Sequence, residues 1–512
     1  MNAAAHDDLS TQWTIELHGE HETHELAQFI ASFVGANDLI TLTGDLGAGK
    51  TAFARALIRI LCNDNALEVP SPTFTLMQLY NGTQFPIVHA DLYRIRGANE
   101  LVELGWDEAG EGALVLVEWP ERAGPALQAN RLDIALRADP QKGPDWRSAT
   151  LTGHGALAAR LSNALAIAAL LEKSGWADAK REFMLGDASS RAYERLTKAD
   201  GSRAILMISP PRPDGPPVRA GKSYSAIARL AENITPFVAL AHGLLAQGLT
   251  APRIHAADLK TGLAVLEDLG LEFCIDANGP VPERYGEAVA ALAHLHTRSL
   301  PAVLPVPGAA DYALPPYDLD AMLIEIELLS EWYAPHMRIV LSSAAKAAFV
   351  NGWRNVLQDI VDGPQTWVLR DYHSPNLLWL DQRKGIERVG VIDFQDCVMG
   401  SPAYDVASLL QDARVTVPAE LELKLLGHYA GLRRASNPDF DMAAFARAYA
   451  IMGAQRATKV LGIFARLDRR DGKPQYLEHM PRVRSYLVRN LSHPALSGIK
   501  GWFSAHLPAL FR

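Results

Sequence analysis

The stretch GDLGAGKT at residues 44–51 constrains the fold most, because it lies between an apolar run and an amphipathic segment. It fits the pattern G-x-x-x-x-G-K-[ST], in which glycines turn backbone N–H groups inward and the next helix offers its N-terminus to negative charge. In such a loop Lys50 reaches the β and γ phosphates and Thr51 ligates magnesium. The plainer interpretation of the same stretch is a glycine-rich turn that caps a buried helix. The strand-like DLITLT before it and the helix-like AFARALIRIL after it favour the phosphate-binding loop.

Length and composition indicate a packed protein of more than one domain. The 512 residues exceed what one hydrophobic core usually organises, and the content of 48% hydrophobic and 21% charged residues is typical of globular proteins. The net charge is −9 and no basic tract is present, so we expect any role on RNA to act through a protein partner or a local patch. The three cysteines are scattered, which argues against a disulfide framework and favours a reducing, cytoplasmic location.

Neither a targeting signal nor a membrane span is expected. The N-terminus MNAAAHDDLSTQ is acidic and has no apolar core, so we interpret residues 1–12 as a disordered tail. The longest apolar stretch, ALAIAALL at 164–171, is shorter than the roughly 18 residues that cross a bilayer. The sequence therefore predicts no contact with a membrane.

The pattern of the chain changes near residue 160. Residues 13–160 alternate strand-like and helix-like segments, which predicts an α/β domain. The segment GHGALAARLSNALAIAALLEKSGW then has helical periodicity, and a strand-and-hairpin pattern follows in FMLGDASSRAYERLT and SRAILMIS. After the loop PPRPDGPPVRAG most of the chain has helical periodicity, so residues 161–512 form the second predicted domain.

A phosphate-binding loop that hydrolyses ATP also needs an acidic anchor for magnesium and a group that orients water. Asp91 in VHADLYR and Glu118 in VLVEWPE both stand at the ends of predicted strands. Glu118 fits the magnesium role best, because it ends an apolar run that would fix its carboxylate beside the loop.

Five segments of the first domain occur in a familiar order. GDLGAGKT, SPTFTLMQLY, HADLYRI, ELGWDE and LVEWPER are ordered and spaced as in the TsaE family of ATPases, and the resemblance covers residues 13 to about 155. It implies a P-loop NTPase fold in which Lys50, Thr51 and Glu118 hold ATP and Mg²⁺. It also implies a switch region made of residues 71–75 with Asp91, and a nucleotide beside Trp119. The other implied ATP-binding residues are Gly44, Asp45, Gly47, Ala48 and Gly49, and the implied catalytic residues of this domain are Asp91 and Glu118.

The same resemblance implies partners. TsaE proteins bind subunits of the threonylcarbamoyl transferase complex, so the ATPase would act on tRNA indirectly, in the modification of the adenosine next to the anticodon. Three plainer interpretations stay open: an ATPase unrelated to tRNA, SPTFTL as an ordinary strand entry, and Trp119 as a core residue.

A second phosphate-handling pattern lies more than three hundred residues later. LRDYHSPNLLWL and VIDFQDC contain Asp371, Asn376 and Asp393. The spacing D-x-x-x-x-N alone arises by chance in a chain of this size. Together, however, the three supply a base for an attacking hydroxyl, an amide ligand for magnesium and a strand-end carboxylate for the bridging metal, which are the parts of kinase phosphoryl transfer.

The segments LRDYHSPNLLWL and GVIDFQDCVMGSPAYDVASLLQD resemble the aminoglycoside phosphotransferase-like kinases. GDASSRAYERL and LEDLG are most similar to the anomeric N-acetylmuramate/N-acetylglucosamine kinases of cell-wall recycling, and the resemblance runs from about residue 166 to the C-terminus. It implies an α+β, protein-kinase-like domain over 161–512, with an N-lobe at about 176–270, a C-lobe at about 271–512, and a small amino sugar as substrate. By the same resemblance Asp371 is the catalytic base, Asn376 and Asp393 are magnesium ligands, Gly186, Ser189, Ser190 and Arg191 cover the ATP phosphates, Glu267 and Leu269 line the adenine hinge, and Asp405 braces the catalytic loop.

One position departs from the kinase pattern. Met207 in RAILMISPP stands where kinases carry a lysine, and a thioether cannot neutralise phosphate charge. Arg191 or another cation would have to replace it, or this lobe binds nucleotide weakly. A rival hypothesis makes the second domain a pseudokinase, a binding module that regulates the ATPase. We interpret His373 as a structural residue, and the acidic run EIELLSE at 325–331 as a solvated helix face. The leading hypothesis is a bifunctional enzyme with two Mg-ATP sites.

Overall fold

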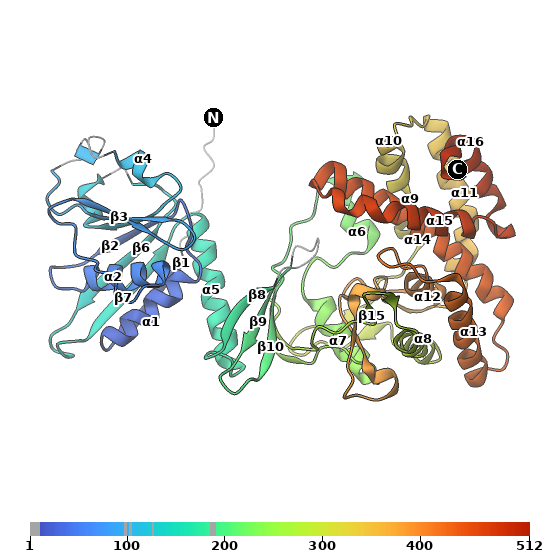
Figure 1. Ribbon diagram of the computed structural model, residues 1–512, viewed down its shortest axis with the longest axis horizontal. Coiled ribbons are helices and arrows are strands. Elements are labelled where there is room, and N and C mark those ends of the chain that lie inside the picture. The colour runs from blue at the N-terminus through green and yellow to red at the C-terminus, as the bar shows by residue number, and fades with distance from the viewer. Residues whose placement is uncertain (1–10, 97–99, 102–104, 125–126, 185–190, 512) are drawn as a thin grey trace. The chain divides into compact units, whose positions relative to one another are not determined.

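The computed structural model describes residues 11–96, 100–101, 105–124, 127–184 and 191–511 (Figure 1). It divides the chain into unit 1, Met1–Ala169, and unit 2, Leu170–Arg512. The division falls within helix α5 (Ala156–Lys173), the same helix that contains the predicted boundary near residue 160. Residues 1–10 of the predicted tail lie outside the described residues, whereas Thr11 and Gln12 already belong to the first strand.

Unit 1 is built on one seven-stranded sheet. The strand order is β1-β7-β6-β2-β5-β4-β3, in which β6, β2, β5 and β4 are parallel neighbours and the outer strands are antiparallel. The strands are β1 (Thr11–Leu17), β2 (Leu39–Thr43), β3 (Met77–Asn81), β4 (Pro86–Asp91), β5 (Leu114–Glu118), β6 (Leu132–Ala138) and β7 (Arg147–Gly153), and the helices are α1 (Glu20–Ala31), α2 (Lys50–Cys62), α4 (Trp106–Gly110), the short η1 (Pro120–Arg122) and α5.

Both faces of this sheet are covered, as expected for parallel strands. Leu114 and Leu116 pack with residues of α1 and α2, whereas Val115 and Val117 pack in a second cluster that includes Leu92 and Leu101. The alternation follows from the period of two in a strand. Because β2, β5 and β4 are parallel, their carboxyl ends meet at one edge of the sheet, where ligands bind in such folds.

Unit 2 begins with a five-stranded antiparallel sheet in the order β13-β14-β10-β9-β8. Its strands are β8 (Lys180–Met184), β9 (Ala192–Thr197), β10 (Arg203–Ile208), β13 (Ile254–Asp258) and β14 (Leu263–Glu267). The remaining strands form two-stranded pairs: β11 (Pro217–Arg219) with β12 (Lys222–Ser223), β15 (Ile275–Asp276) with β16 (Gly279–Pro280), β17 (Val303–Leu304) with β18 (Tyr312–Ala313), β19 (Thr366–Val368) with β22 (Val398–Gly400), and β20 (Leu377–Trp379) with β21 (Val389–Val391).

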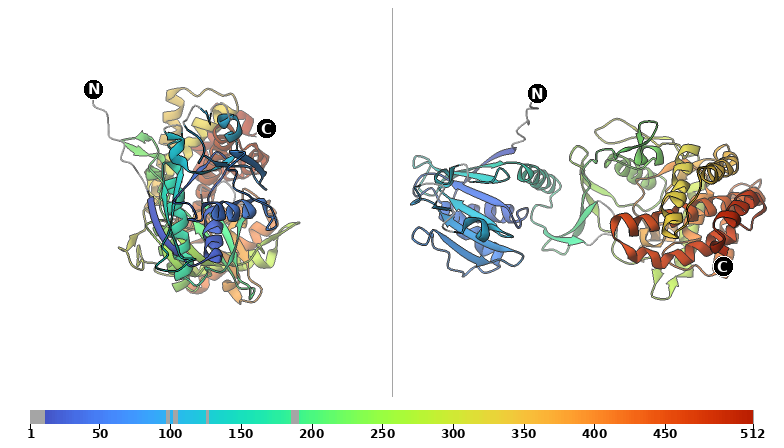
Figure 2. Two further views of the ribbon diagram at one scale, coloured as in Figure 1. Left: turned by 90° about the vertical axis from the view of Figure 1, so that its left-hand side faces the viewer. Right: turned by 90° about the horizontal axis from the view of Figure 1, so that it is seen from above.

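The rest of unit 2 is mainly helical, as the periodicity after residue 220 predicts, and its C-terminal helices are coloured orange to red in Figure 2. The α-helices are α6 (Tyr224–Ala228), α7 (Thr235–Ala246), α8 (Pro282–His296), α9 (Leu319–Leu328), α10 (Ala334–His336), α11 (Ser343–Val361), α12 (Ala403–Leu410), α13 (Ala419–Ser436), α14 (Met442–Asp471), α15 (Met480–Asn490) and α16 (Ser497–His506). The π-helical segment is η3 (Leu329–Tyr333), and the 3₁₀ segments are η4 (Ser374–Asn376), η5 (Gly385–Arg388), η6 (Pro474–His479), η7 (Pro494–Leu496) and η8 (Pro508–Phe511).

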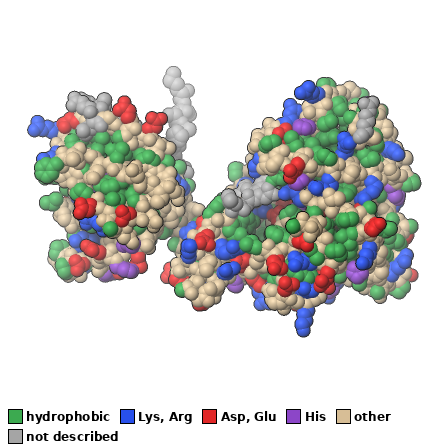
Figure 3. Space-filling model, viewed as in Figure 1, with side chains coloured by type: hydrophobic (Ala, Val, Ile, Leu, Met, Phe, Trp, Pro, Cys, Tyr) green, Lys and Arg blue, Asp and Glu red, His purple; other side chains and the backbone are tan. Residues whose placement is uncertain are grey.

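On the surface, charged side chains of both signs are spread over the face of each unit shown in Figure 3. Within the described ranges, no helix combines the length and the apolar character needed to cross a bilayer.

Candidate active sites

The predicted phosphate-binding loop connects β2 to α2 in unit 1. Gly44 has φ +140°, and a Cβ there would overlap the carbonyl oxygen of Leu136, so only glycine fits. Lys50, the first residue of α2, is almost fully buried and donates to the carbonyl oxygens of Gly44 at 2.6 Å and Asp45 at 3.1 Å. Its Nζ also lies 3.8 Å from the ring centroid of Trp119. The lysine is therefore folded into the loop, beside Trp119, for which the TsaE resemblance implies a place next to the nucleotide.

The loop contains two further predicted residues that differ in exposure. Ala48 is buried, and its N–H donates to the carbonyl oxygen of Asp45 at 3.1 Å. Gly47 has φ +82° and nothing near its missing side chain. Burial lowers the pKa of Lys50, while the carboxylates of Glu118 and Glu121 act in the opposite direction. A bound phosphate would add negative charge and favour the protonated lysine further.

Glu118 ends β5 and faces the loop, as the sequence predicts. It is 2% exposed, and its two oxygens have different partners: Oε2 accepts from Thr51 Oγ1 at 3.0 Å, and Oε1 lies 3.0 Å from His89 Nε2. His89 was missed by the sequence reasoning. The signal for it was present, because His89 and Asp91 lie two residues apart on β4 and so point to the same face of the sheet.

Asp91 ends β4 directly opposite Glu118 in the parallel register. Its Oδ2 accepts from Ser71 Oγ at 2.7 Å and from Thr73 Oγ1 at 3.0 Å, and its Oδ1 accepts from the N–H of Tyr93 at 3.0 Å. The structure thus brings the predicted segment 71–75 together with Asp91.

In unit 2, the predicted catalytic residues lie around the β20–β21 pair. Asn376 Nδ2 donates to the carbonyl oxygen of Asp371 at 2.9 Å, which joins the two ends of the loop. Leu377 pairs with Val391, and the N–H of Ile392 donates to the carbonyl oxygen of Asn376 at 3.1 Å. Asn376 and Asp393 therefore stand at the same end of this pair.

The Asp371 side chain is 40% exposed, so it can meet a substrate, and His373 Nε2 lies 3.8 Å from its Oδ1. Burial alone would raise the pKa of Asp371, but the interaction with His373 and the charges of Lys459 and Arg456 outweigh it and lower that pKa. The carboxylate is then ionised at neutral pH, as a base that accepts a hydroxyl proton must be. His373 is thus a neighbour of the predicted base.

Asp405, at the start of α12, contacts the residues just before Asp371 in the predicted catalytic loop. Its carboxylate accepts from the N–H groups of Leu369 at 2.6 Å and Arg370 at 2.9 Å. Burial raises the pKa of Asp405 to about 7, although both backbone hydrogen bonds act in the opposite direction.

Arg191 stands close to the predicted metal ligand. Its Nη1 lies 2.7 Å from Asp393 Oδ1, and Gln395 Nε2 donates to the same oxygen at 2.9 Å. Met207 on β10 is 1% exposed and belongs to the hydrophobic core. Its thioether carries no charge that could act on the phosphates. The other predicted phosphate-covering residues, Gly186, Ser189 and Ser190, lie outside the described residues.

The predicted adenine hinge follows β14. Glu267 Oε1 is 2.7 Å from Arg383 Nη2, and Leu269 packs with Leu378 and Leu380. The other carboxylate oxygen of Glu267 accepts from the N–H of Arg253 at 3.2 Å, and the N–H of Glu267 donates to the carbonyl oxygen of Arg253 at 2.8 Å.

The candidate metal positions supply oxygen ligands. Thr51 and Glu118 offer a hydroxyl and a carboxylate in unit 1, and Asn376 and Asp393 offer an amide and a carboxylate in unit 2. No cluster of three or more His, Cys, Asp or Glu suited to a metal occurs in the described part of the chain. Two protein ligands in each site fit Mg²⁺, which prefers oxygen and takes the rest of its shell from phosphates and water.

Two family models match the chain, one in its N-terminal part and one in its C-terminal part. The model described as "Threonylcarbamoyl adenosine biosynthesis protein TsaE" matches residues 17–146. The model described as "Phosphotransferase enzyme family" matches residues 181–445, just over half of the 512 residues.

Individual relatives divide in the same way. The chain is 40% identical to the N-acetylmuramate/N-acetylglucosamine kinase of Caulobacter vibrioides, over 67% of this chain and 96% of that protein. A kinase of the same name from Pseudomonas putida is 34% identical, over 59% of this chain and 80% of that protein. The tRNA threonylcarbamoyladenosine biosynthesis protein TsaE of Rickettsia conorii is 43% identical, over 24% of this chain and 69% of that protein. The chain therefore belongs to the TsaE family through its N-terminal part and to the phosphotransferase enzyme family through its C-terminal part, as a fusion of an ATP hydrolase and a phosphotransferase.

Proposed function

We propose that unit 1 has a P-loop NTPase fold and hydrolyses ATP for the threonylcarbamoyladenosine modification of tRNA. We propose further that unit 2 phosphorylates N-acetylmuramate or N-acetylglucosamine in cell-wall recycling. The observation that carries the first part is the contact of Thr51 with Glu118 beside a loop that holds Lys50. The second part is supported by the joined loop of Asp371 and Asn376, with Asp393 at the same end of the β20–β21 pair.

In unit 1, the loop N–H groups and the N-terminus of α2 bind the phosphates, and Lys50 exchanges its contacts with Gly44 and Asp45 for phosphate oxygens. Thr51 and Glu118 would hold Mg²⁺, which would supply positive charge against the phosphates. Asp91 is the residue proposed to orient the attacking water. It also holds the switch segment 71–75, because its carboxylate accepts hydrogen bonds from Ser71 and Thr73. Trp119 lies beside Lys50 and is the residue proposed to lie beside the nucleotide.

In unit 2, the Asp371 carboxylate accepts the proton of a sugar hydroxyl as that oxygen attacks the γ-phosphate. Asn376 and Asp393 are the proposed Mg²⁺ ligands. Arg191 is the cation proposed to act on the phosphates in place of the missing lysine. Its guanidinium contacts Asp393 and therefore lies at the proposed metal position, where the phosphates would bind.

The proposed partners of unit 1 are the subunits of the threonylcarbamoyl transferase complex, with tRNA as an indirect partner. The names of the Rickettsia relatives support this part of the proposal. All three cysteines are free, which agrees with the cytoplasm as the proposed location.

One pair of variants tests both activities in the full-length chain. Lys50→Ala is expected to abolish ATP hydrolysis measured without sugar, and to leave sugar-dependent release of ADP intact. Asp371→Asn is expected to have the converse effect, with sugar phosphorylation reduced by roughly 10²–10⁴-fold. N-acetylmuramate, N-acetylglucosamine and a set of other amino sugars serve as acceptors.

Two outcomes would overturn parts of the proposal. If the parent protein phosphorylates none of the sugars, unit 2 is a pseudokinase that regulates the ATPase, as the methionine at position 207 would allow. If the chain does not copurify with threonylcarbamoyl transferase subunits, the tRNA role fails and a general ATPase remains.

A further inference from the structure

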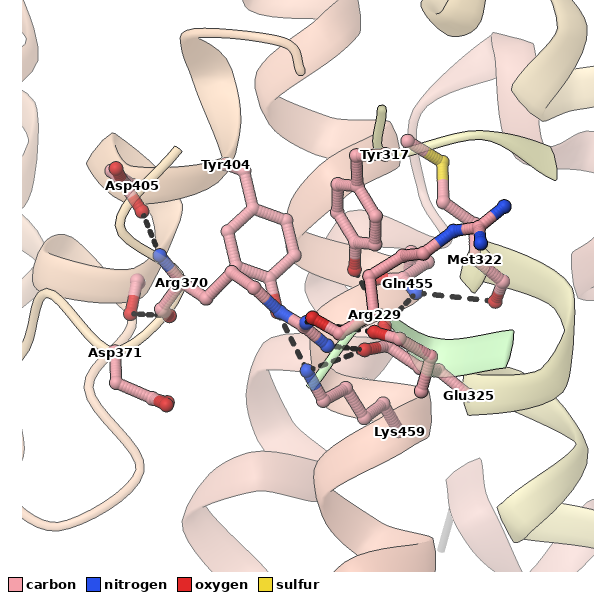
Figure 4. A network of polar contacts seen from close by, with 12 residues as sticks. Arg229, Tyr317, Met322, Glu325, Arg370, Asp371, Tyr404, Asp405, Gln455 and Lys459 are labelled. Atoms are coloured by element: carbon pink, nitrogen blue, oxygen red, sulfur yellow. Dashed lines mark hydrogen bonds and ion pairs between the residues drawn. The ribbon is translucent and has the colours of Figure 1, made fainter. Parts of the chain in front are cut away.

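A fully buried carboxylate lies at the centre of a polar network in unit 2 (Figure 4). Glu325 on α9 is 0% exposed. Its partners are the Arg370 guanidinium, Lys459 Nζ at 2.9 Å, the Tyr317 hydroxyl at 2.5 Å and Gln455 Nε2 at 3.0 Å. A carboxylate this deep in a protein is costly unless donors surround it, and here four do. The network therefore replaces the water that Glu325 loses on folding.

The network reaches the catalytic loop through Arg370, the residue directly before Asp371. Arg370 has φ +66°, a conformation that is strained for any residue with a Cβ and persists only where its surroundings impose it. The Arg370 guanidinium also donates to the carbonyl oxygen of Ala228 at 2.8 Å. The carbonyl oxygen of Arg370 accepts from Ser408 Oγ at 3.2 Å. Both ends of Arg370 are thus fixed, and the direction of the next residue is fixed with them.

Lys459 adds a second cation from α14. Besides Glu325, its Nζ lies 3.3 Å from the Tyr404 hydroxyl, and Gln455 lies one helical turn before it on the same helix. Arg370 and Lys459 carry two positive charges against the one negative charge of Glu325, so the three side chains together hold one net positive charge. Burial would raise the pKa of Glu325, but Lys459 and Arg370 outweigh it and lower that pKa, so the carboxylate stays ionised.

Glu325 itself cannot touch a substrate, because none of its surface is accessible. A buried ion pair is also weak evidence for stability, since apolar residues of similar size often serve as well. What this pair does provide is a fixed direction for the arginine that precedes Asp371.

We propose that Glu325 is a positioning residue for phosphoryl transfer: it holds the Arg370 guanidinium so that Asp371 faces the acceptor hydroxyl, and Lys459 is a second cation that keeps Glu325 ionised. The inference rests on the proposed role of Asp371 as the base and deepens it. It adds α9 and α14, the helices that carry Glu325 and Lys459, to the parts on which the kinase reaction depends.

The first test is Glu325→Gln in the full-length protein. The amide keeps the shape but removes the charge that anchors Arg370, so kcat for sugar phosphorylation should fall by about 10- to 100-fold, in the range that small misplacements of catalytic groups cause. The KM values for ATP and sugar should stay unchanged, because the variant alters no group that binds them. Glu327→Gln is the matched control on the same helix: it breaks the 2.5 Å pair with Arg219 and should leave kcat unchanged.

A second variant separates positioning from charge balance. Glu325→Gln leaves two uncompensated cations, whereas Glu325→Gln combined with Lys459→Met returns the network to one net positive charge. The double variant should regain much of the lost thermal stability, while kcat stays low because Arg370 still lacks its carboxylate. Recovery of kcat together with stability would overturn the inference and leave Glu325 a structural residue.

Hydrogen exchange of the peptide 367–380 gives a readout that needs no activity. Exchange in this peptide should be faster in Glu325→Gln and in the double variant than in the parent or in Glu327→Gln. Unchanged exchange would overturn the inference even if kcat fell. If instead Asp371→Asn kept full kinase activity while the exchange changed as expected, the proposed base would be wrong and the loop anchor would stand.

Discussion

His89 shows how a single side chain can hold a candidate metal ligand in place. Its Nε2 lies 3.0 Å from Glu118 Oε1, and both residues are buried. His89→Leu should leave that oxygen without a donor, at a cost of about 1–3 kcal/mol in the free energy of unfolding. ATP hydrolysis measured without sugar should fall as well, because Glu118 loses one of the two contacts that orient it. Thermal unfolding and ADP release measure the two effects.

A second histidine–carboxylate pair of unit 1 supplies the control for this variant. His154 Nε2 lies 2.8 Å from Asp133 Oδ2, and Asp133 also has Thr41 and Arg131 as partners. His154→Leu should lower stability without lowering hydrolysis. Equal losses of hydrolysis in both variants would contradict a specific role of His89.

His296 of unit 2 makes stability depend on pH. Burial lowers the pKa of His296 to about 3, and Arg433 acts in the same direction. Between about pH 6.5 and pH 3 the unfolded chain binds a proton here that the folded chain does not, so acidification lowers the free energy of unfolding by up to about 1.4 kcal/mol per pH unit. His296→Gln should remove this slope in denaturant unfolding curves taken from pH 7 to pH 5. His255 is exposed, so His255→Gln should keep the slope. An unchanged slope in His296→Gln would show that the His296 imidazole is not held neutral in the folded protein.

At the scale of helices, the close crossing of α14 and α9 depends on Gly462. A Cβ at this position would overlap the backbone of Leu328, the last residue of α9. Gly462→Ala should push the helices apart and destabilise unit 2 by about 1–3 kcal/mol, and kcat of the kinase should fall because the same helices carry Glu325 and Lys459. Gly431→Ala on α13 is the control, since open space surrounds that glycine and alanine should stabilise the helix by about 0.5–1 kcal/mol. A stabilised Gly462→Ala variant would contradict the tight crossing.

The sequence predicts well those elements whose chemistry is local. The loop at 44–51 and the apolar run that ends at Glu118 are short segments, and the structure brings Thr51 and Glu118 together as the motif requires. Glu325 is the opposite case: the interpretation of residues 325–331 as a solvated helix face is wrong for this residue, which is fully buried. Charged residues usually face water, and nothing local reveals that Arg370 and Lys459 converge on this one from distant parts of the chain.

The pattern around Met207 likewise could not predict which cation lies beside Asp393, because that contact is also between distant parts of the chain. The sequence shows that the usual kinase lysine is absent, but the pairing of Arg191 with Asp393 joins residues 202 positions apart. Such pairs depend on how the strands and helices pack, which single-sequence periodicity does not encode.

At the scale of the molecule, each unit has a hydrophobic core of its own. Phe53 on α2 belongs to the core of unit 1, and Phe349 on α11 belongs to the core of unit 2; both are fully buried. A domain with its own hydrophobic core can in principle fold alone, so two units with separate cores are expected to unfold separately.

Calorimetry should therefore record two unfolding transitions in the full-length chain. Phe53→Ala should cost unit 1 about 3–5 kcal/mol and lower the midpoint of one transition by on the order of 10 °C, because unit 1 has 169 residues. Phe349→Ala should lower the other midpoint and leave the first in place. A saturating sugar substrate should raise only the transition that Phe349→Ala shifts, since binding stabilises the unit that binds. A shift of both transitions by either substitution would show that the two units unfold as one cooperative body. The separation of the ATPase and kinase activities would then be tested with ligands instead of core variants.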